Sequence, residues 1–179
     1  TQAIVLDLME SRVKLSLPAW KAANYDLSKR LANVASQYTY VEFALKSKEA
    51  DVTVKGALDA YTALVDKAGD EAKVTAANKG LLDALASARQ AVYGAQLANP
   101  KFQAELVFRL LSWTNDTYAR NTTQTGADLE YAYQRAYGYE QAAKTRFTAI
   151  ANSTPDAAVI SAQFVVLDLW HAPLPVLPI

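Results

Sequence analysis

The side chains with the strongest potential for chemistry lie between residues 131 and 140. Glu140 stands on an apolar helical stripe where Leu would be expected, and a buried carboxylate must be paired or protonated, as at many functional sites. Tyr133 and Tyr137 are one helical turn apart, next to Arg135. These residues predict an aromatic pocket or a contact surface, because Tyr and Arg are enriched at interfaces. The alternatives are that Glu140 reaches solvent at the edge of the stripe and that the phenol groups only rim a packed helix.

Arg109 is a separate candidate, because Phe108 and Leu110 flank it in an apolar segment. An Arg can hold a carboxylate through two parallel hydrogen bonds. It can also lay its aliphatic stem on apolar surface and keep its charge in water. The candidate ligand- or partner-binding residues are therefore Arg109, Tyr133, Arg135, Tyr137 and Glu140.

The motifs of the common catalytic and cofactor sites are absent from the sequence. The chain has no Cys and one His, His171, so it has no thiol nucleophile and no zinc-finger ligands. A strained Gly-x-Ser-x-Gly turn is missing, as are the P-loop, the dinucleotide glycine fingerprint, the EF-hand loop and the paired Glu-x-x-His of di-iron bundles. We therefore predict no metal and no cofactor and assign no catalytic residue, and the absent motifs weigh against an enzyme without deciding the question. We assign His171 to a favourable position at a helix C-terminus.

Charge and hydropathy limit the kinds of partner. Lys and Arg number 18, Asp and Glu number 18, and the net charge is zero, which argues against nucleic acid because phosphate binding needs a basic excess. No apolar run reaches the ~18 residues of a transmembrane helix, and no signal peptide is recognisable, so we expect a soluble chain. Sequons at Asn115, Asn121 and Asn152 favour an extracytoplasmic location: secreted, periplasmic or in an organelle lumen.

Helices must position these side chains, because apolar residues recur with a period of 3.6 between a few Gly and Pro residues. The clearest pattern predicts a helix over residues 18–48, begun by Pro18, with apolar residues every seven positions from Trp20 to Val41. Further helices are predicted over residues 2–16, 53–68, 71–98, 100–119, 127–151 and 155–170. The expected fold is all-α: a single-domain antiparallel bundle of about six to seven helices over residues 1–179.

Caps and core positions follow from the same pattern. Asp70 and Asn99 are predicted to cap the helices that follow them. The last helix is expected to bury Val159, Ala162, Val166 and Leu169. The predicted core includes Trp20, Leu27, Val34, Leu81, Leu85, Leu106, Leu110, Trp113 and Phe147.

The chain ends in an apolar, proline-rich tail. Pro173, Pro175 and Pro178 prevent a helix, so residues 172–179 should run extended. The Leu, Val and Ile side chains of this tail gain free energy by leaving water. We expect the tail to lie in a groove of its own bundle or of a partner, in the second case as the contact of a homo-oligomer.

Two short segments resemble a known family. The opening helix of the exported chorismate mutases is similar to Leu8-Met9-Glu10-Ser11-Arg12 followed by Trp20-Lys21-Ala22-Ala23-Asn24, and those enzymes are all-α and of similar size. The resemblance implies that Arg12 and Lys21 help to bind the carboxylates of a dianionic substrate.

Two functional hypotheses result. The missing motifs, the tyrosine-rich segment and the apolar tail favour a non-catalytic interaction module that binds a protein partner or an apolar or aromatic small molecule outside the cytoplasm. The alternative is an isomerase of the exported chorismate mutase type, since that reaction needs only cationic and polar groups around a dianion. A cavity lined by two or more Arg or Lys side chains with a facing Glu or Gln would favour the enzyme.

Overall fold

The computed structural model describes residues 2–38, 50–120 and 123–170. Within these ranges every regular element is a helix and there is no strand, so the all-α prediction is confirmed. Contacts divide the chain into two compact units, Thr1–Leu97 and Ala98–Ile179, and each is described by itself. The prediction of one domain over the whole chain stays a prediction.

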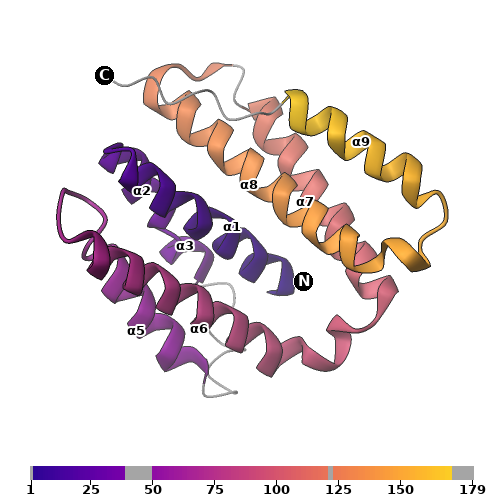
Figure 1. Cartoon of the computed structure of the whole chain (residues 1–179), viewed down its shortest axis with the longest axis horizontal. Coiled ribbons are helices and arrows are strands. Elements are labelled where there is room, and N and C mark those ends of the chain that lie inside the picture. Colours follow the sequence, from indigo (N-terminus) through magenta and orange to yellow (C-terminus); the bar gives the residue numbers. More distant parts are fainter. Residues whose placement is uncertain (1, 39–49, 121–122, 171–179) are drawn as a thin grey trace. The chain divides into compact units, whose positions relative to one another are not determined.

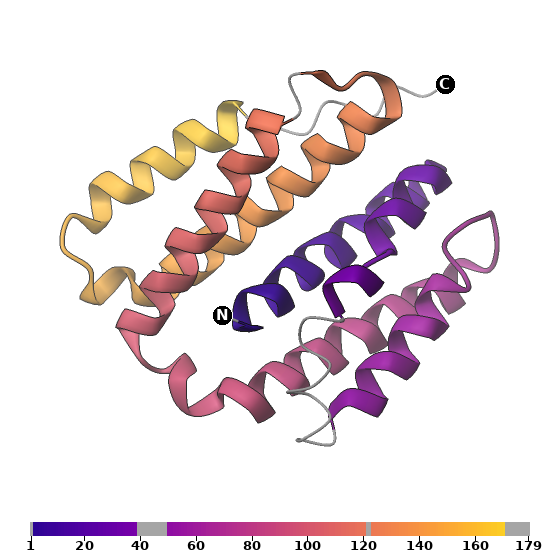
Figure 2. The same cartoon turned by 180° about the vertical axis from the view of Figure 1, so that it is seen from behind.

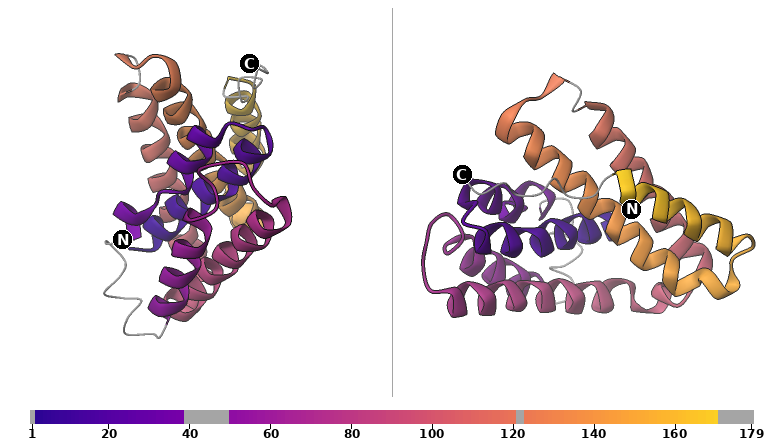
Figure 3. Two further views of the ribbon diagram at one scale, coloured as in Figure 1. Left: turned by 90° about the vertical axis from the view of Figure 1, so that its left-hand side faces the viewer. Right: turned by 45° about the horizontal axis from the view of Figure 1, so that its top comes forward.

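The first unit is a bundle around α1 (Gln2–Lys21) and α6 (Glu71–Leu97). These two helices pack together and run antiparallel (Figures 1 and 3). The short helices α2 (Tyr25–Ala32) and α3 (Ala35–Tyr38) lie against α1, and α5 (Ala50–Thr62) lies against α6. Apolar side chains from all five helices share one core, which includes Met9, Val13, Tyr38, Val54, Tyr61, Leu81 and Leu85.

The predicted continuous helix over residues 18–48 is wrong. Helix α1 runs through Pro18 to Lys21, and the chain then turns at Ala23, whose φ is 60°. Asn24 starts α2, because its side-chain oxygen accepts a hydrogen bond from the backbone N–H of Leu27 at 3.1 Å. The longest described helix is instead α6, with 27 residues. The part of the pattern on residues 39–48 lies outside the described residues.

The heptad pattern nevertheless identified buried positions. Trp20, Leu27 and Val34 are all buried, although the first lies on α1, the second on α2 and the third after α2 has ended. Trp20 and Val34 belong to the core shared by the helices of the first unit, and Leu27 is buried as well. The repeat of apolar residues every seven positions therefore predicted which residues are buried. It did not predict whether one helix continues through them, because a short turn between helices can leave the seven-residue spacing unchanged.

Other helix ends agree with local sequence signals. Asp70 and Asn99 cap α6 and α7 as predicted: their side-chain oxygens accept hydrogen bonds from the N–H of Ala72 and of Lys101, both at 2.9 Å. Helix α5 ends at Thr62, before the predicted residue 68. The connection that follows is held by Trp20, whose indole N–H donates to the carbonyl of Lys67 at 3.0 Å.

The second unit is an antiparallel pair of long helices with a third helix alongside. Helix α7 spans Pro100–Arg120 and α8 spans Gly126–Ile150, and the two pack along their length. After the 3₁₀ turn η2 (Ala151–Ser153), α9 (Ala157–Trp170) runs back beside α8 (Figure 2). The aromatic rings of Phe147 and Phe164 join α8 to α9.

Two packing predictions in this unit are wrong. Trp113 is 46% exposed, although the other eight predicted core residues are buried. Helix α7 buries the face of Leu106, Leu110 and Thr114, and Trp113 lies beside that face. The predicted stripe of α9 points outward as well, because Phe164 is the side chain that this helix buries. The predictions for the Leu169 side chain, for His171 and for the tail 172–179 lie outside the described part of the chain.

Candidate functional site

Three side chains of α8 lie near Tyr118 of α7: Tyr133, Tyr137 and Glu140. Glu140 is completely buried on α8, so the alternative in which it reaches solvent is wrong. The rings of Tyr118 and Tyr133 meet edge to face with centroids 5.2 Å apart. Tyr133, Tyr137 and Glu140 follow one another at helical spacing on α8, and all three act electrostatically on Tyr118 of α7. We call Tyr118, Tyr133, Tyr137 and Glu140 the tyrosine–glutamate cluster.

The cluster strongly disfavours a second negative charge. Burial raises the pKa of the Tyr118 phenol well above its ordinary value, and the nearby Glu140 carboxylate raises that pKa further. Tyr118 therefore stays a neutral phenol at every physiological pH. With its proton firmly held, the Tyr118 phenol is not an activated nucleophile, and its ring and O–H can contact an aromatic or hydrogen-bonding group.

Tyr118 is the member of the cluster that sequence reasoning missed. It follows Leu110 and Thr114 along the buried face of α7 at a spacing of four residues. That continuation of the stripe was the available signal.

The two predicted arginines are placed elsewhere. Arg135 lies over the ring of Tyr131, with its guanidinium carbon 5.3 Å from the ring centroid, as in a cation–π contact. Arg109 is exposed on α7, and its guanidinium contacts Glu105 at 2.8 Å, one turn away. Such an exposed pair contributes little to stability. Arg109 is exposed, whereas Leu110 next to it is buried. The role of Arg109 as a ligand- or partner-binding residue stays a prediction.

A second polar group fixes α9 to α8. The Asp168 carboxylate accepts a hydrogen bond from the side-chain amide of Gln141 at 2.7 Å and forms an ion pair with Lys144. The hydrogen bond to Asp168 raises the pKa of Lys144, and the charge of Glu140, one turn away, adds to this effect. Asp168 is the only ionisable residue in the sequence of α9, so the charge of this helix is directed toward α8.

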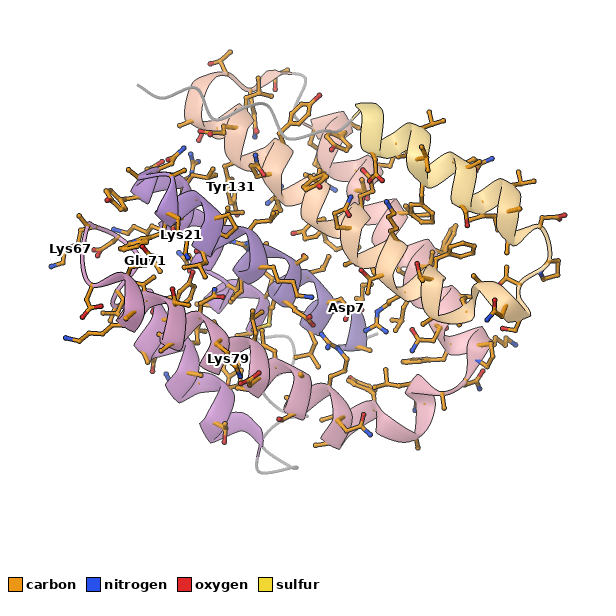
Figure 4. The ribbon with its side chains drawn as sticks, viewed as in Figure 1. Asp7, Lys21, Lys67, Glu71, Lys79 and Tyr131 are labelled. Atoms are coloured by element: carbon orange, nitrogen blue, oxygen red, sulfur yellow. The ribbon has the colours of Figure 1, made fainter. Side chains whose placement is uncertain are left out.

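A buried ion-pair group in the first unit was not foreseen. Arg89 on α6 contacts Asp7 at 3.1 Å and also pairs with Glu10, both on α1. Asp7 is only 4% exposed, and Figure 4 marks its place on α1. Burial by itself raises the pKa of Glu10, but the charges of Arg89 and Lys14 outweigh that effect and hold the pKa below its ordinary value. The sequence around Asp7, Glu10 and Arg89 looks like that of ordinary solvent-exposed charged residues, so it does not reveal that these three pair with one another.

The two residues implied by the enzyme resemblance serve local structure. Arg12 is buried, and its guanidinium donates to the backbone carbonyls of Arg30 at 2.6 Å and Asn33 at 2.7 Å, at the C-terminal end of α2. Lys21 is exposed and pairs with Glu71 at 2.8 Å, at the end of the first unit where Lys67 also lies (Figure 4). The structure therefore does not bring Arg12 and Lys21 together toward one ligand.

An apolar surface on α9 is the other candidate site. Val159, Val165 and Val166 are each more than half exposed, and Ala158 and Ala162 are exposed beside them. We call these five residues the outer face of α9. On the opposite side of the same helix Phe164 is buried and Ile160 and Leu167 are half-buried. This helix is thus apolar on both sides, whereas a helix that only covers a core is polar on its outside.

Comparison with protein-family models, with curated proteins and with solved structures finds no match for this chain. Among the helices of the described ranges, none is both long and apolar enough to cross a membrane. In the same ranges, His, Asp and Glu form no group of three that could hold a metal ion.

Proposed function

We propose that this chain is a helical-bundle interaction module that binds a protein partner through the outer face of α9. The observation that carries the proposal is the pair of apolar faces on α9: one side holds Phe164 in the core, while Val159, Val165 and Val166 stay more than half exposed. Single exposed apolar residues are common. A continuous row of them along one helix typically marks a binding surface.

The energetics favour a partner with its own apolar surface. Complete burial of a Val side chain contributes about 1.5–3 kcal/mol, and part of that gain offsets the entropy lost on association. The outer face carries no charge, because Asp168 is turned to Lys144 and Gln141. An apolar helix laid along the outer face fits this chemistry.

The tyrosine–glutamate cluster supports this role indirectly. Glu140 and the neighbouring Lys144 lie on the stripe of α8 that holds α9 through Asp168. The cluster therefore helps to fix the orientation of α9 and hence which of its faces is presented. A small aromatic ligand bound at the cluster, beside the rings of Tyr118 and Tyr133, is the second candidate function of these residues.

The proposal also includes a location outside the cytoplasm. The side chains of Asn115 and Asn152 are exposed, as glycosylation at a sequon requires. Mass spectrometry of the chain isolated from its natural source tests this part: glycan on either residue supports it, and a cytoplasmic chain without glycan contradicts it.

Site-specific photo-crosslinking tests the interaction itself. A diazirine amino acid replaces Val166, and a matched chain carries it at Ala86, an exposed position on α6. We expect covalent protein adducts from residue 166 in the organism that makes the chain, and none from residue 86. A chain that carries the diazirine at residue 166 together with Val159→Ser and Val165→Ser should give few adducts, because these changes remove apolar area from the outer face at exposed positions. Adducts with water alone at residue 166 would contradict the proposal.

A further inference from the structure

We infer that the partner bound by the outer face of α9 is a second copy of this chain, with the two α9 helices antiparallel about a twofold axis at Ala162. This inference rests on the proposed function, because it names the occupant of the same surface. Its basis is the spacing, the side-chain sizes and the charge of the outer face.

The outer face is symmetric about its middle residue. Val159 and Val165 lie three residues before and after Ala162, and Ala158 and Val166 lie four residues before and after it. All five positions are exposed. An antiparallel copy centred on the same residue therefore places Val159 against Val165 of the second chain and Ala158 against Val166 of the second chain. This is the self-complementary arrangement that a twofold interface requires.

The side-chain sizes suit that register. Ala162 meets its own copy at the axis, where a small residue lets the two helix axes pack about 9–10 Å apart, within the usual range. Each Ala158 faces a Val166, so a small side chain meets a larger one on both sides of the axis. The Val159–Val165 contacts then fill the space next to the central alanines.

The charge of α9 is also compatible with self-association. Asp168 is the only ionisable residue of α9, and it binds Gln141 and Lys144 of α8. Two copies therefore bring no like charges together at the interface. A charged partner would gain no electrostatic attraction from this surface, because the surface carries no charge of its own.

Cysteine substitution tests the register directly, because the natural chain has no Cys. Ala162→Cys changes one small exposed side chain and should leave the fold intact. At the axis, the two introduced cysteines fall within the Cα separation of about 4.4–6.8 Å that a disulfide needs. Under mild oxidation we expect disulfide-linked dimers of Ala162→Cys to form roughly tenfold faster than those of the control Ala86→Cys, because association raises the effective thiol concentration.

Two further single-cysteine chains determine the direction of the helices. A mixture of Val159→Cys and Val165→Cys should give mainly the mixed disulfide, as the antiparallel register requires. Predominant linkage of Val159→Cys to itself would indicate parallel helices and overturn the inference. An Ala162→Cys rate equal to that of Ala86→Cys would also overturn it.

Alkylation of the single thiol in the Ala162→Cys chain separates the competing occupants. In dilute solution we expect this thiol to react as fast as the thiol of the Ala86→Cys chain. Protection that is independent of protein concentration would mean that the chain itself covers the surface, for instance with residues 171–179, and would overturn the inference. Protection only by phosphatidylcholine vesicles would overturn it in favour of a membrane surface. If the disulfides fail but the diazirine at residue 166 labels another protein, the proposed function stands without the second copy.

Discussion

The ring of Phe164 on α9 packs against the ring of Phe147 on α8, with centroids 5.7 Å apart and planes inclined by 33°. Both side chains are buried. This contact decides which side of α9 faces the unit, and it leaves Val159, Val165 and Val166 on the other side. The presentation of the outer face is therefore a consequence of one aromatic pair and of the Asp168–Lys144 ion pair near the end of the helix.

The first prediction concerns this pair. Phe164→Ala should lower the free energy of unfolding by about 3–5 kcal/mol, because it empties a buried aromatic site. Phe108→Ala makes the same chemical change at a side chain that is 73% exposed, and its cost should stay within about 0.5 kcal/mol. Urea unfolding followed by circular dichroism measures both. Equal costs for the two variants would show that α9 is not held by Phe164.

The second prediction concerns the titration of Tyr118. Because burial and the Glu140 carboxylate raise its pKa, Glu140→Gln should lower that pKa, while burial alone keeps it above the ordinary value of about 10. The difference in phenolate absorbance between each chain and its Tyr118→Phe variant isolates this group. Glu105→Gln, an exposed change on α7, should leave the titration unaltered.

The same raised pKa has a consequence for stability. The folded chain holds the Tyr118 proton more tightly than the unfolded chain does. The contribution of this phenol is therefore complete below a pH of about 10 and is lost as the pH rises through the folded-state pKa. Tyr118→Phe should remove this part of the alkaline loss of stability. An unchanged alkaline unfolding profile in that variant would disprove the assignment.

The third prediction concerns Arg89. Arg89→Gln leaves the buried Asp7 carboxylate without its ion pair, and we expect a loss of about 3 kcal/mol at neutral pH. Lys79→Gln removes an exposed pair with Asp83 and should cost about 0–1 kcal/mol. Chemical unfolding of the full chain measures both, and equal losses would contradict a special role for the buried pair.

The pH dependence of that loss provides a separate check. Glu10 has a lowered pKa in the folded chain. Its contribution is present above the ordinary value of 4.5 and is lost as the pH falls through the lowered folded-state value. The stability difference between the natural chain and Arg89→Gln should therefore narrow below a pH of about 4.5. A difference that stays constant down to a pH of about 3 would show that Arg89 does not stabilise the charge of Glu10.

Sequence reasoning succeeded where a signal is local. The caps at Asp70 and Asn99 depend on a side chain and the N–H groups two or three residues later, and both formed. The burial of Leu27 and Leu110 followed from apolar periodicity. The closeness of Tyr133, Tyr137 and Glu140 followed from helical spacing on one element.

Sequence reasoning failed where two elements compete for one residue. A proline such as Pro18 can begin a helix or lie inside one. In this chain Pro18 lies inside α1, between the buried residues Val13 and Trp20 of the same helix. Helix α9 has two apolar faces, and only the position of Phe147 on α8 selects between them. The ion pair of Arg89 with Glu10 joins residues 79 positions apart, a separation across which one sequence carries no pairing information.

Unfolding by urea at two protein concentrations is the most direct measurement of whether the outer face of α9 binds another molecule of the chain. The variant Val159→Ser, Val165→Ser changes only exposed positions. At low concentration it should unfold within about 0.5 kcal/mol of the natural chain. At high concentration the natural chain should become more stable than the variant, because association stabilises the folded state by mass action. A stability difference that is the same at both concentrations would contradict intermolecular binding. If that constant difference is well above about 0.5 kcal/mol, these valines make contacts within a single chain.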